Sequence, residues 1–184
     1  SSPHRISSIG IARAFQNIEL FRGLTVLDNL MLARHQYLKY NLLQAVIFFG
    51  KASRQEAENR ASVEDVIDFM ELEPYRKRMV GSLAYGIQKR VEVARALTLG
   101  PKLLLLDEPM AGMNIEEKED MVRFILDIQK ERAITVVLVE HDLGVVMDIS
   151  DYVYVLDFGQ LIGAGKPADV ARDPKVIEAY IGEE

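Results

Sequence analysis

Cysteine and tryptophan are both absent from this sequence of 184 residues. Without cysteine, neither a disulfide framework nor a thiolate metal site can form. Long hydrophobic runs are also lacking, because the most apolar window, 38–49, is interrupted by polar residues and is shorter than the ~20 residues of a membrane-spanning helix. The first ten residues lack the charged start and apolar run of a signal peptide. We therefore expect neither a membrane span nor an export signal.

Basic residues are outnumbered by acidic ones. The chain has 22 Lys and Arg against 28 Asp and Glu, a formal net charge of -6. This balance disfavours nonspecific binding to polyanions, so we expect no nucleic-acid partner. The length fits one domain, which buries roughly 70% of the surface of its unfolded chain.

The most informative segment is 102–109, KLLLLDEP, in which four leucines precede Asp107 and Glu108. A short apolar run of this kind is typical of a strand buried on both faces in a parallel sheet. The carboxyl end of such a strand is where open α/β sheets bind ligands. Two acids at that position are costly to bury unless a cation or a proton transfer uses them, and a Mg-nucleotide with an attacking water would use both. The alternative is an acidic turn after a core strand.

Further strands are expected over 6–15, ending at Gln16, over 134–139, again buried on both faces, and over 152–156 and 160–164, joined by a tight turn. Between Asn17 and Leu99 no segment has a confident strand pattern. The strand-rich pieces, 1–16 and 100–184, are expected to form one sheet core. The segment of about 17–99 is expected to be a helical subdomain, within which the apolar window 38–49 either packs or docks a membrane partner.

Helix starts are marked by pairs in which Ser, Thr or Asn is followed three residues later by an acid. Such pairs are Thr25 with Asp28, Ser53 with Glu56, and Asn114 with Glu117. Asp142 is a further candidate cap. Apolar spacing predicts a helix over 85–99, and Asp173-Pro174 predicts a last helix that ends near Ile181.

Five short motifs occur along the chain in this order: AFQN at 14–17, LAYGIQ at 83–88, LLLLDEP at 103–109, AGMN at 111–114 and VEHD at 139–142. Together they resemble the Q-loop, signature, Walker B, D-loop and switch-histidine motifs of the nucleotide-binding subunit of an ATP-binding cassette (ABC) transporter. The residues in and around these motifs are most similar to the branch of the family that imports branched-chain amino acids. The resemblance implies an α/β fold with a P-loop NTPase-like (RecA-like) parallel-sheet core and an inserted α-helical subdomain.

The resemblance also implies roles for single residues. Glu108 orients and deprotonates the attacking water, and His141 contacts and senses the γ-phosphate. Asp107 and Gln16 hold Mg²⁺, and Gln16 reports the nucleotide state to a membrane subunit. The alternatives without a catalytic role are that His141 is a hydrogen-bonded histidine at a strand end and that Gln16 is a solvated glutamine after a strand.

Two segments are implied to act at the contact between two subunits. The signature binds ATP of the facing subunit in trans and comprises Leu83, Ala84, Tyr85, Gly86, Ile87 and Gln88. The D-loop comprises Ala111, Gly112, Met113 and Asn114. A helix start presents free N–H groups to phosphate, and glycine lets the backbone approach closely. The chain departs from the commonest family pattern, which has serine and glycine at Ala84 and Tyr85 and aspartate at Asn114.

ATP and Mg²⁺ are the implied cofactors. The implied partners are a second ABC ATPase subunit, in a homodimer or heterodimer, and transmembrane permease subunits. The implied location is cytoplasmic, peripheral on the inner face of the plasma membrane. Alternatives are an ATPase of the lipopolysaccharide-export type, a soluble cassette ATPase of translation or DNA repair, and a catalytically silent regulatory module.

No G-x-x-x-x-G-K-[ST] phosphate loop (Walker A) occurs in this sequence. That loop supplies the N–H cradle and the lysine for the β- and γ-phosphates, together with a hydroxyl for Mg²⁺. We therefore expect a cassette that is incomplete at its amino terminus, the carboxyl-terminal portion of a longer protein. By itself it is expected to lack ATPase activity and to expose unpaired strand edges.

Overall fold

The computed structural model describes residues 10–14, 20–35 and 49–181. Gln16 and the apolar window up to residue 48 lie outside the described residues. The chain divides into two compact units, residues 1–139 and 140–184. The predicted division into a sheet core and a helical subdomain at 17–99 is a different one and stays a prediction.

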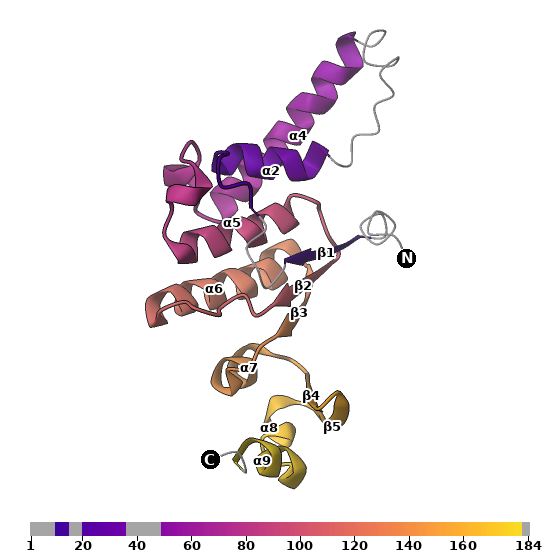
Figure 1. The fold of residues 1–184 in the computed structure, drawn as a ribbon. Coiled ribbons are helices and arrows are strands. Elements are labelled where there is room, and N and C mark those ends of the chain that lie inside the picture. The colour runs from indigo at the N-terminus through magenta and orange to yellow at the C-terminus, as the bar shows by residue number, and fades with distance from the viewer. Residues whose placement is uncertain (1–9, 15–19, 36–48, 182–184) are drawn as a thin grey trace. The chain divides into compact units, whose positions relative to one another are not determined.

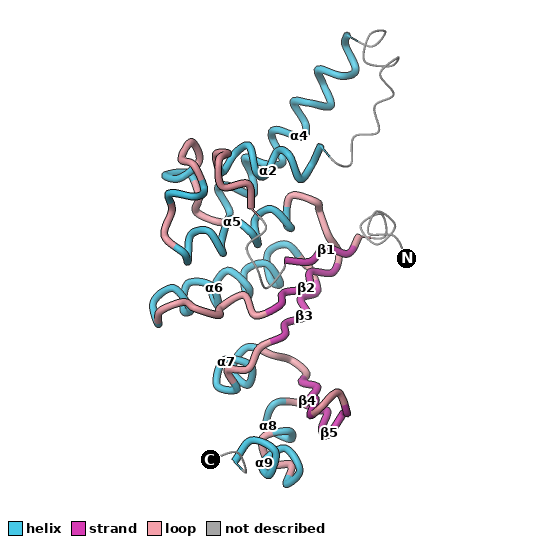
Figure 2. The backbone as a smooth tube through the Cα atoms, in the orientation of Figure 1, coloured by secondary structure: helices cyan, strands magenta, loops and turns pink. Residues whose placement is uncertain are grey.

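The first unit contains a three-stranded parallel sheet (Figures 1 and 2). Its strands are β1 (Ile11–Ala14), β2 (Leu103–Asp107) and β3 (Thr135–Val139), in the order β1-β2-β3. The register pairs Leu104 with Ala12 on one side and with Val136 on the other. β2 is therefore the central strand of the described sheet. Its leucines are buried at 104 and 106 but only partly buried at 103 and 105, so the prediction of burial on both faces is wrong for this strand.

The two faces of this sheet are buried to different extents. Leu104 and Leu106 are 0% and 1% exposed, whereas Val137 and Val139 on the opposite face of β3 are 45% and 56% exposed. The prediction that 134–139 is buried on both faces is therefore wrong for this structure. In the described residues β3 is an edge strand against which α6 packs, and the face that carries Val137 and Val139 has little cover.

Four helices of at least ten residues are described in the first unit: α2 (Val26–His35), α4 (Phe49–Phe69), α5 (Tyr85–Leu97) and α6 (Ile115–Arg132). Short 3-10 turns occur at Glu73–Tyr75 and Val80–Ser82. Among the described residues, no helix is long and apolar enough to cross a membrane.

The capping pairs have mixed outcomes. The Thr25 hydroxyl accepts from the Asp28 N–H at 3.1 Å, and the Asn114–Glu117 box forms completely, so both predicted starts are confirmed. The start predicted at Ser53 is wrong, because α4 already begins at Phe49. The four residues before Ser53 include no proline, so nothing in the backbone stops the helix from extending.

A charged and aromatic cluster joins the end of α4 to α5 and α6. The Glu71 carboxylate accepts from both terminal nitrogens of Arg123, at 2.9 and 3.1 Å, and this bond raises the pKa of Arg123. Arg90 lies 4.0 Å from Glu71, and its guanidinium carbon is 5.2 Å from the centre of the Phe124 ring. Burial lowers the pKa of Arg90. The cluster fixes α4 and α5 against α6 through a bidentate pair and ring stacking.

The second unit contains α7 (Leu143–Ile149), β4 (Val153–Asp157), β5 (Gln160–Gly165), α8 (Pro167–Val170) and α9 (Pro174–Ile181). Asp142 caps α7 and α9 ends at Ile181, as predicted. The short helix α8 was not predicted. A small core is formed by Val153, Val155, Val170 and Val176.

The expectation of one sheet is corrected by the second unit. β4 and β5 pair antiparallel with each other in a separate two-stranded sheet. Phe158 and Gly159 both have positive φ, 41° and 78°, which suits a two-residue hairpin turn. Such a turn makes the two strands each other's nearest partners.

The unequal faces of the sheet predict unequal costs of truncation. Leu104→Ala should destabilise the chain by about 2–5 kcal/mol, because the side chain is fully buried. Leu103→Ala, on the partly exposed face of the same strand, should cost less than half as much. Chemical denaturation measures both free energies. Equal costs would contradict the one-sided burial.

Candidate functional site

The two acids lie where β2 leaves the sheet. Asp107 is the last residue of the strand, and Glu108 has a φ of 46°. The Glu108 N–H donates to the Val139 carbonyl at 2.9 Å, and the Ala111 N–H donates to the Glu108 carbonyl at 3.2 Å. A left-handed conformation at a residue with a side chain costs about 1–3 kcal/mol and concentrates at functional sites. The chain thus turns sharply at the predicted catalytic acid, immediately after the predicted metal ligand.

Asp107 forms an ion pair that no pattern in the sequence indicates. Its Oδ2 accepts from Arg13 Nη2 at 2.7 Å, with 27% of the Asp107 side chain exposed and 51% of the Arg13 side chain. The partner comes from β1, where Arg13 is in register with Leu105 of β2. Only the strand order and register bring the two together, and neither is encoded in a local motif.

The donor chemistry at Asp107 fits magnesium, which prefers carboxylate oxygens. One of its two oxygens, Oδ2, already accepts from Arg13 Nη2 at 2.7 Å. In the described part of the chain, no group of three or more His, Asp or Glu side chains gathers as a metal cluster. The roles of Asp107 and Gln16 as metal ligands stay predictions, and Gln16 lies outside the described residues.

The signature segment forms the start of α5. Ala84 is its N-cap residue, with φ -58° and ψ 152°, and supplies no side-chain bond to the first turn. Gln88 is buried, and its Nε2 donates to the Leu83 carbonyl at 2.8 Å, which folds the segment against itself. Without a side-chain cap, the N–H groups of the first turn suit an anion.

The D-loop ends in the N-cap of α6. Gly112 has a φ of 77°, and Met113 is buried. Asn114 Oδ1 accepts from the Glu117 N–H at 2.9 Å, while the Asn114 N–H donates to Glu117 Oε2 at 3.1 Å. Asparagine is as good a helix cap as the aspartate of the commonest pattern.

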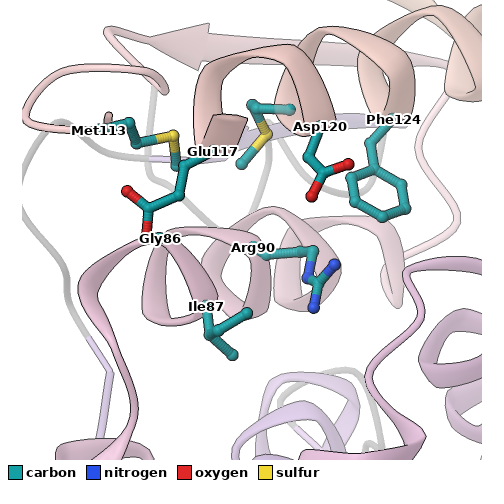
Figure 3. A pocket seen from close by; sticks show the side chains of 8 residues that line it. Gly86, Ile87, Arg90, Met113, Glu117, Asp120 and Phe124 are labelled. Carbon is teal, nitrogen blue, oxygen red and sulfur yellow. The ribbon is translucent and has the colours of Figure 1, made fainter. Parts of the chain in front are cut away.

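The signature segment and the D-loop touch each other. A Cβ on Gly112 would lie 3.2 Å from Tyr85 Cε1, and a Cβ on Gly86 would lie 2.6 Å from Glu117 Cδ. Figure 3 shows the Glu117 carboxylate directed toward Gly86, from α6 to α5. A cavity of about 30 Å³ between the two helices, with Arg90 and Phe124 in its wall, has room for a water molecule but not for a nucleotide.

His141 belongs to the second unit. Its side chain is 73% exposed, and Nδ1 lies 3.9 Å from Glu140 Oε2. The backbone N–H of His141 donates to the same oxygen at 3.3 Å. Asp142 Oδ1 accepts from the Val145 N–H at 3.4 Å and so caps α7. The motif thus places an exposed imidazole one residue before a helix cap, and its role toward phosphate stays a prediction.

A family profile described as "ABC transporter" matches residues 2–111, more than half of the chain. This chain belongs to the ABC transporter family. A second profile, "Branched-chain amino acid ATP-binding cassette transporter", matches residues 160–184. The family assignment confirms the resemblance carried by the five motifs and makes the chain a nucleotide-binding protein of the ABC type.

Curated relatives cover nearly the whole of this ABC chain. The high-affinity branched-chain amino acid transport ATP-binding protein BraF of Pseudomonas aeruginosa is 37% identical over 180 residues, 98% of this chain and 71% of that protein. The LivG protein of Escherichia coli, with the same description, is 36% identical over 179 residues, 97% of this chain and 70% of its own length.

Solved structures share the fold. The ADP conformation of MJ1267, an ATP-binding cassette of an ABC transporter, superposes with a TM-score of 0.80 and 29% identity, covering 99% of this chain and 72% of that one. A nucleotide-free ATP-binding cassette gives 0.78 and 31%, with the same coverage. The predicted P-loop NTPase-like α/β fold is confirmed.

The uncapped start of α5 yields a stability prediction. Ala84→Ser should stabilise the chain by about 0.5–1 kcal/mol, because Ala84 already has the extended backbone of an N-cap and lacks only the oxygen. The same substitution at Ala61, exposed within α4, should instead destabilise slightly. Urea denaturation compares the two. A loss of stability in Ala84→Ser would contradict the capping geometry.

Proposed function

We propose that this chain forms part of an ATP-hydrolysing subunit that energises the import of branched-chain amino acids or similar solutes. Hydrolysis is proposed for the intact protein, in which a phosphate loop, absent from this sequence, completes the nucleotide site. The observation that carries the proposal is the match to BraF and LivG along almost the whole chain, together with the paired acids at the end of β2. The proposed partners are a second ABC ATPase subunit and transmembrane permease subunits. The proposed location is the cytoplasmic face of the plasma membrane, as a peripheral subunit.

The proposed chemistry is the in-line attack of water on the γ-phosphate of ATP. Glu108 accepts the proton of the attacking water. Its backbone turns sharply immediately after Asp107, whose carboxylate pairs with Arg13. Asp107 contributes a carboxylate oxygen to Mg²⁺, with Gln16 as a second ligand. Bound Mg²⁺ neutralises charge that develops on the phosphate oxygens.

The start of α5 is proposed to bind the γ-phosphate of a nucleotide held by the facing subunit. The first turn, from Tyr85 to Ile87, presents N–H groups at the positive end of the helix dipole, and the Ala84 side chain adds no competing acceptor. The D-loop, 111–114, lies against this segment and belongs to the same subunit contact. His141 is proposed to donate to the γ-phosphate, which its exposed imidazole allows.

The proposal predicts that Glu108→Gln abolishes hydrolysis but not nucleotide binding. The amide keeps the size of the side chain but cannot accept the proton, so ATP turnover should fall by about 100-fold or more. The assay measures phosphate release by the protein assembled with its permease partners in vesicles, and a fluorescent ATP analogue measures binding.

The matched control is Glu119→Gln, which removes one negative charge from an exposed position on α6. It should leave turnover unchanged. Turnover in Glu108→Gln close to the wild-type value would refute the proposed role of Glu108, and no ATP-driven uptake of leucine by the wild-type assembly would refute the importer.

A further inference from the structure

Two contacts between side chains and glycines join the signature segment to the D-loop, and they run in opposite directions. Tyr85 of the signature packs against Gly112 of the D-loop, and Glu117, just after the D-loop, packs against Gly86 of the signature. The signature therefore supplies a bulky side chain and a glycine to the junction, and the D-loop with the first turn of α6 supplies the other glycine and the other side chain. Figure 3 shows the contact between Glu117 and Gly86.

Glu117 leaves no room for a side chain at Gly86, whereas the backbone conformation of Gly86 does not itself require glycine. Its φ lies outside the left-handed range, and it occupies the first turn of α5, where alanine is ordinarily the better helix former. A methyl group there would meet the Cδ and Cγ of Glu117 at 2.6 and 2.9 Å. The side chain of Glu117 cannot yield without cost, because its Oε2 accepts from the Asn114 N–H in the capping box.

Tyr85 closes the junction from the other side. Gly112 has a φ of 77°, a backbone conformation that favours glycine. A Cβ at this position would lie only 3.2 Å from Tyr85 Cε1, so the tyrosine side chain also leaves little room for a larger residue. Tyr85 is 44% exposed, so part of its side chain remains accessible while Cε1, Cζ and Oη lie nearest the loop. This tyrosine stands where the commonest signature has glycine, and a glycine would leave the D-loop uncovered.

The junction connects directly to the turn that carries the proposed catalytic acid. Gly112 follows Ala111, whose N–H donates to the Glu108 carbonyl at 3.2 Å. A displacement of the start of α5 would therefore be transmitted through two packed contacts and one hydrogen bond to the backbone of Glu108.

We infer that Tyr85 and Glu117 are positioning residues that lock the signature segment to the D-loop, so that the start of α5 and the turn at Glu108 keep a fixed relative position. The lock itself rests on packing alone. Its consequence for ATP hydrolysis rests on the proposed function.

A double-mutant cycle on the thermal unfolding of the 184-residue chain tests the lock. Gly86→Ala should lower the unfolding midpoint in the wild-type background, because the new methyl group meets Glu117. In the Glu117→Ala background the same change should leave the midpoint unchanged or raise it, since only the higher helix propensity of alanine remains. An equal loss of midpoint in both backgrounds would overturn the lock.

Two matched controls separate the contact from general effects on helices. Glu116→Ala removes a neighbouring, exposed acid from the first turn of α6, and Gly86→Ala should remain destabilising in that background. Gly144→Ala occupies the equivalent position of α7, two residues after the N-cap, where a Cβ would meet Asp142 Oδ1 at an ordinary 3.5 Å. This control should not lower the midpoint.

The positioning role is tested by hydrolysis in the protein assembled with its permease partners. Tyr85→Gly and Glu117→Ala should lower kcat about tenfold with little change in KM for ATP, because a misplaced Glu108 slows the chemical step more than it weakens binding. Tyr85→Phe, which keeps the ring, should lower kcat less than Tyr85→Gly does. Glu116→Ala, at a neighbouring exposed position of α6, should retain wild-type turnover.

The outcomes distinguish the two claims. Absence of hydrolysis in the wild-type assembly would refute the proposed function and leave the lock to the unfolding cycle. Suppose that Glu117→Ala removes the loss of unfolding midpoint caused by Gly86→Ala, while kcat is unchanged in Tyr85→Gly and in Glu117→Ala. The contact would then stand, and the positioning role in hydrolysis would be overturned. A change in KM alone would do the same.

Discussion

The parallel pairing of β2 with β1 and β3 is the constraint on which the rest of the structure depends. It places Arg13 beside Asp107, and it continues past the end of the strand through the bond from the Glu108 N–H to the Val139 carbonyl. Because these bonds hold the backbone on both sides of the two acids, the chain tolerates a left-handed turn at Glu108. The D-loop, α6 and the contact with the signature segment all follow from the direction of that turn.

In the first unit, arginines form ion pairs with acids at two places, at the end of β2 and between the helices. Arg13 offsets Asp107 at the strand end, while Arg123 and Arg90 meet at Glu71, where α4 ends. Arg90 pays a desolvation cost that its aromatic and acidic neighbours offset. The segment after α4 and helix α5 are thereby held against α6. The first turn of α6 also contacts the signature segment.

Local signals predicted the elements well, and tertiary pairing explains the failures. The caps at Thr25, Asn114 and Asp142 were found because a capping bond is formed within three residues. The burial of 134–139 and the membership of the hairpin strands were wrong, because neighbours in a sheet depend on distant segments. The pairing of Arg13 with Asp107 and the packing of Tyr85 on Gly112 were missed for the same reason. Glu117 was identified as a capping residue, yet its contact with Gly86 has no sequence signal.

The central claim is that ATP hydrolysis at the end of β2 drives the import of branched-chain amino acids or similar solutes. Accumulation of labelled leucine in vesicles that carry the assembled transporter, with nucleotide supplied only to the ATPase side, tests it most directly. The account predicts accumulation against a gradient with ATP and Mg²⁺ and none with a non-hydrolysable ATP analogue. Equal accumulation with the analogue, or none with ATP, would contradict it.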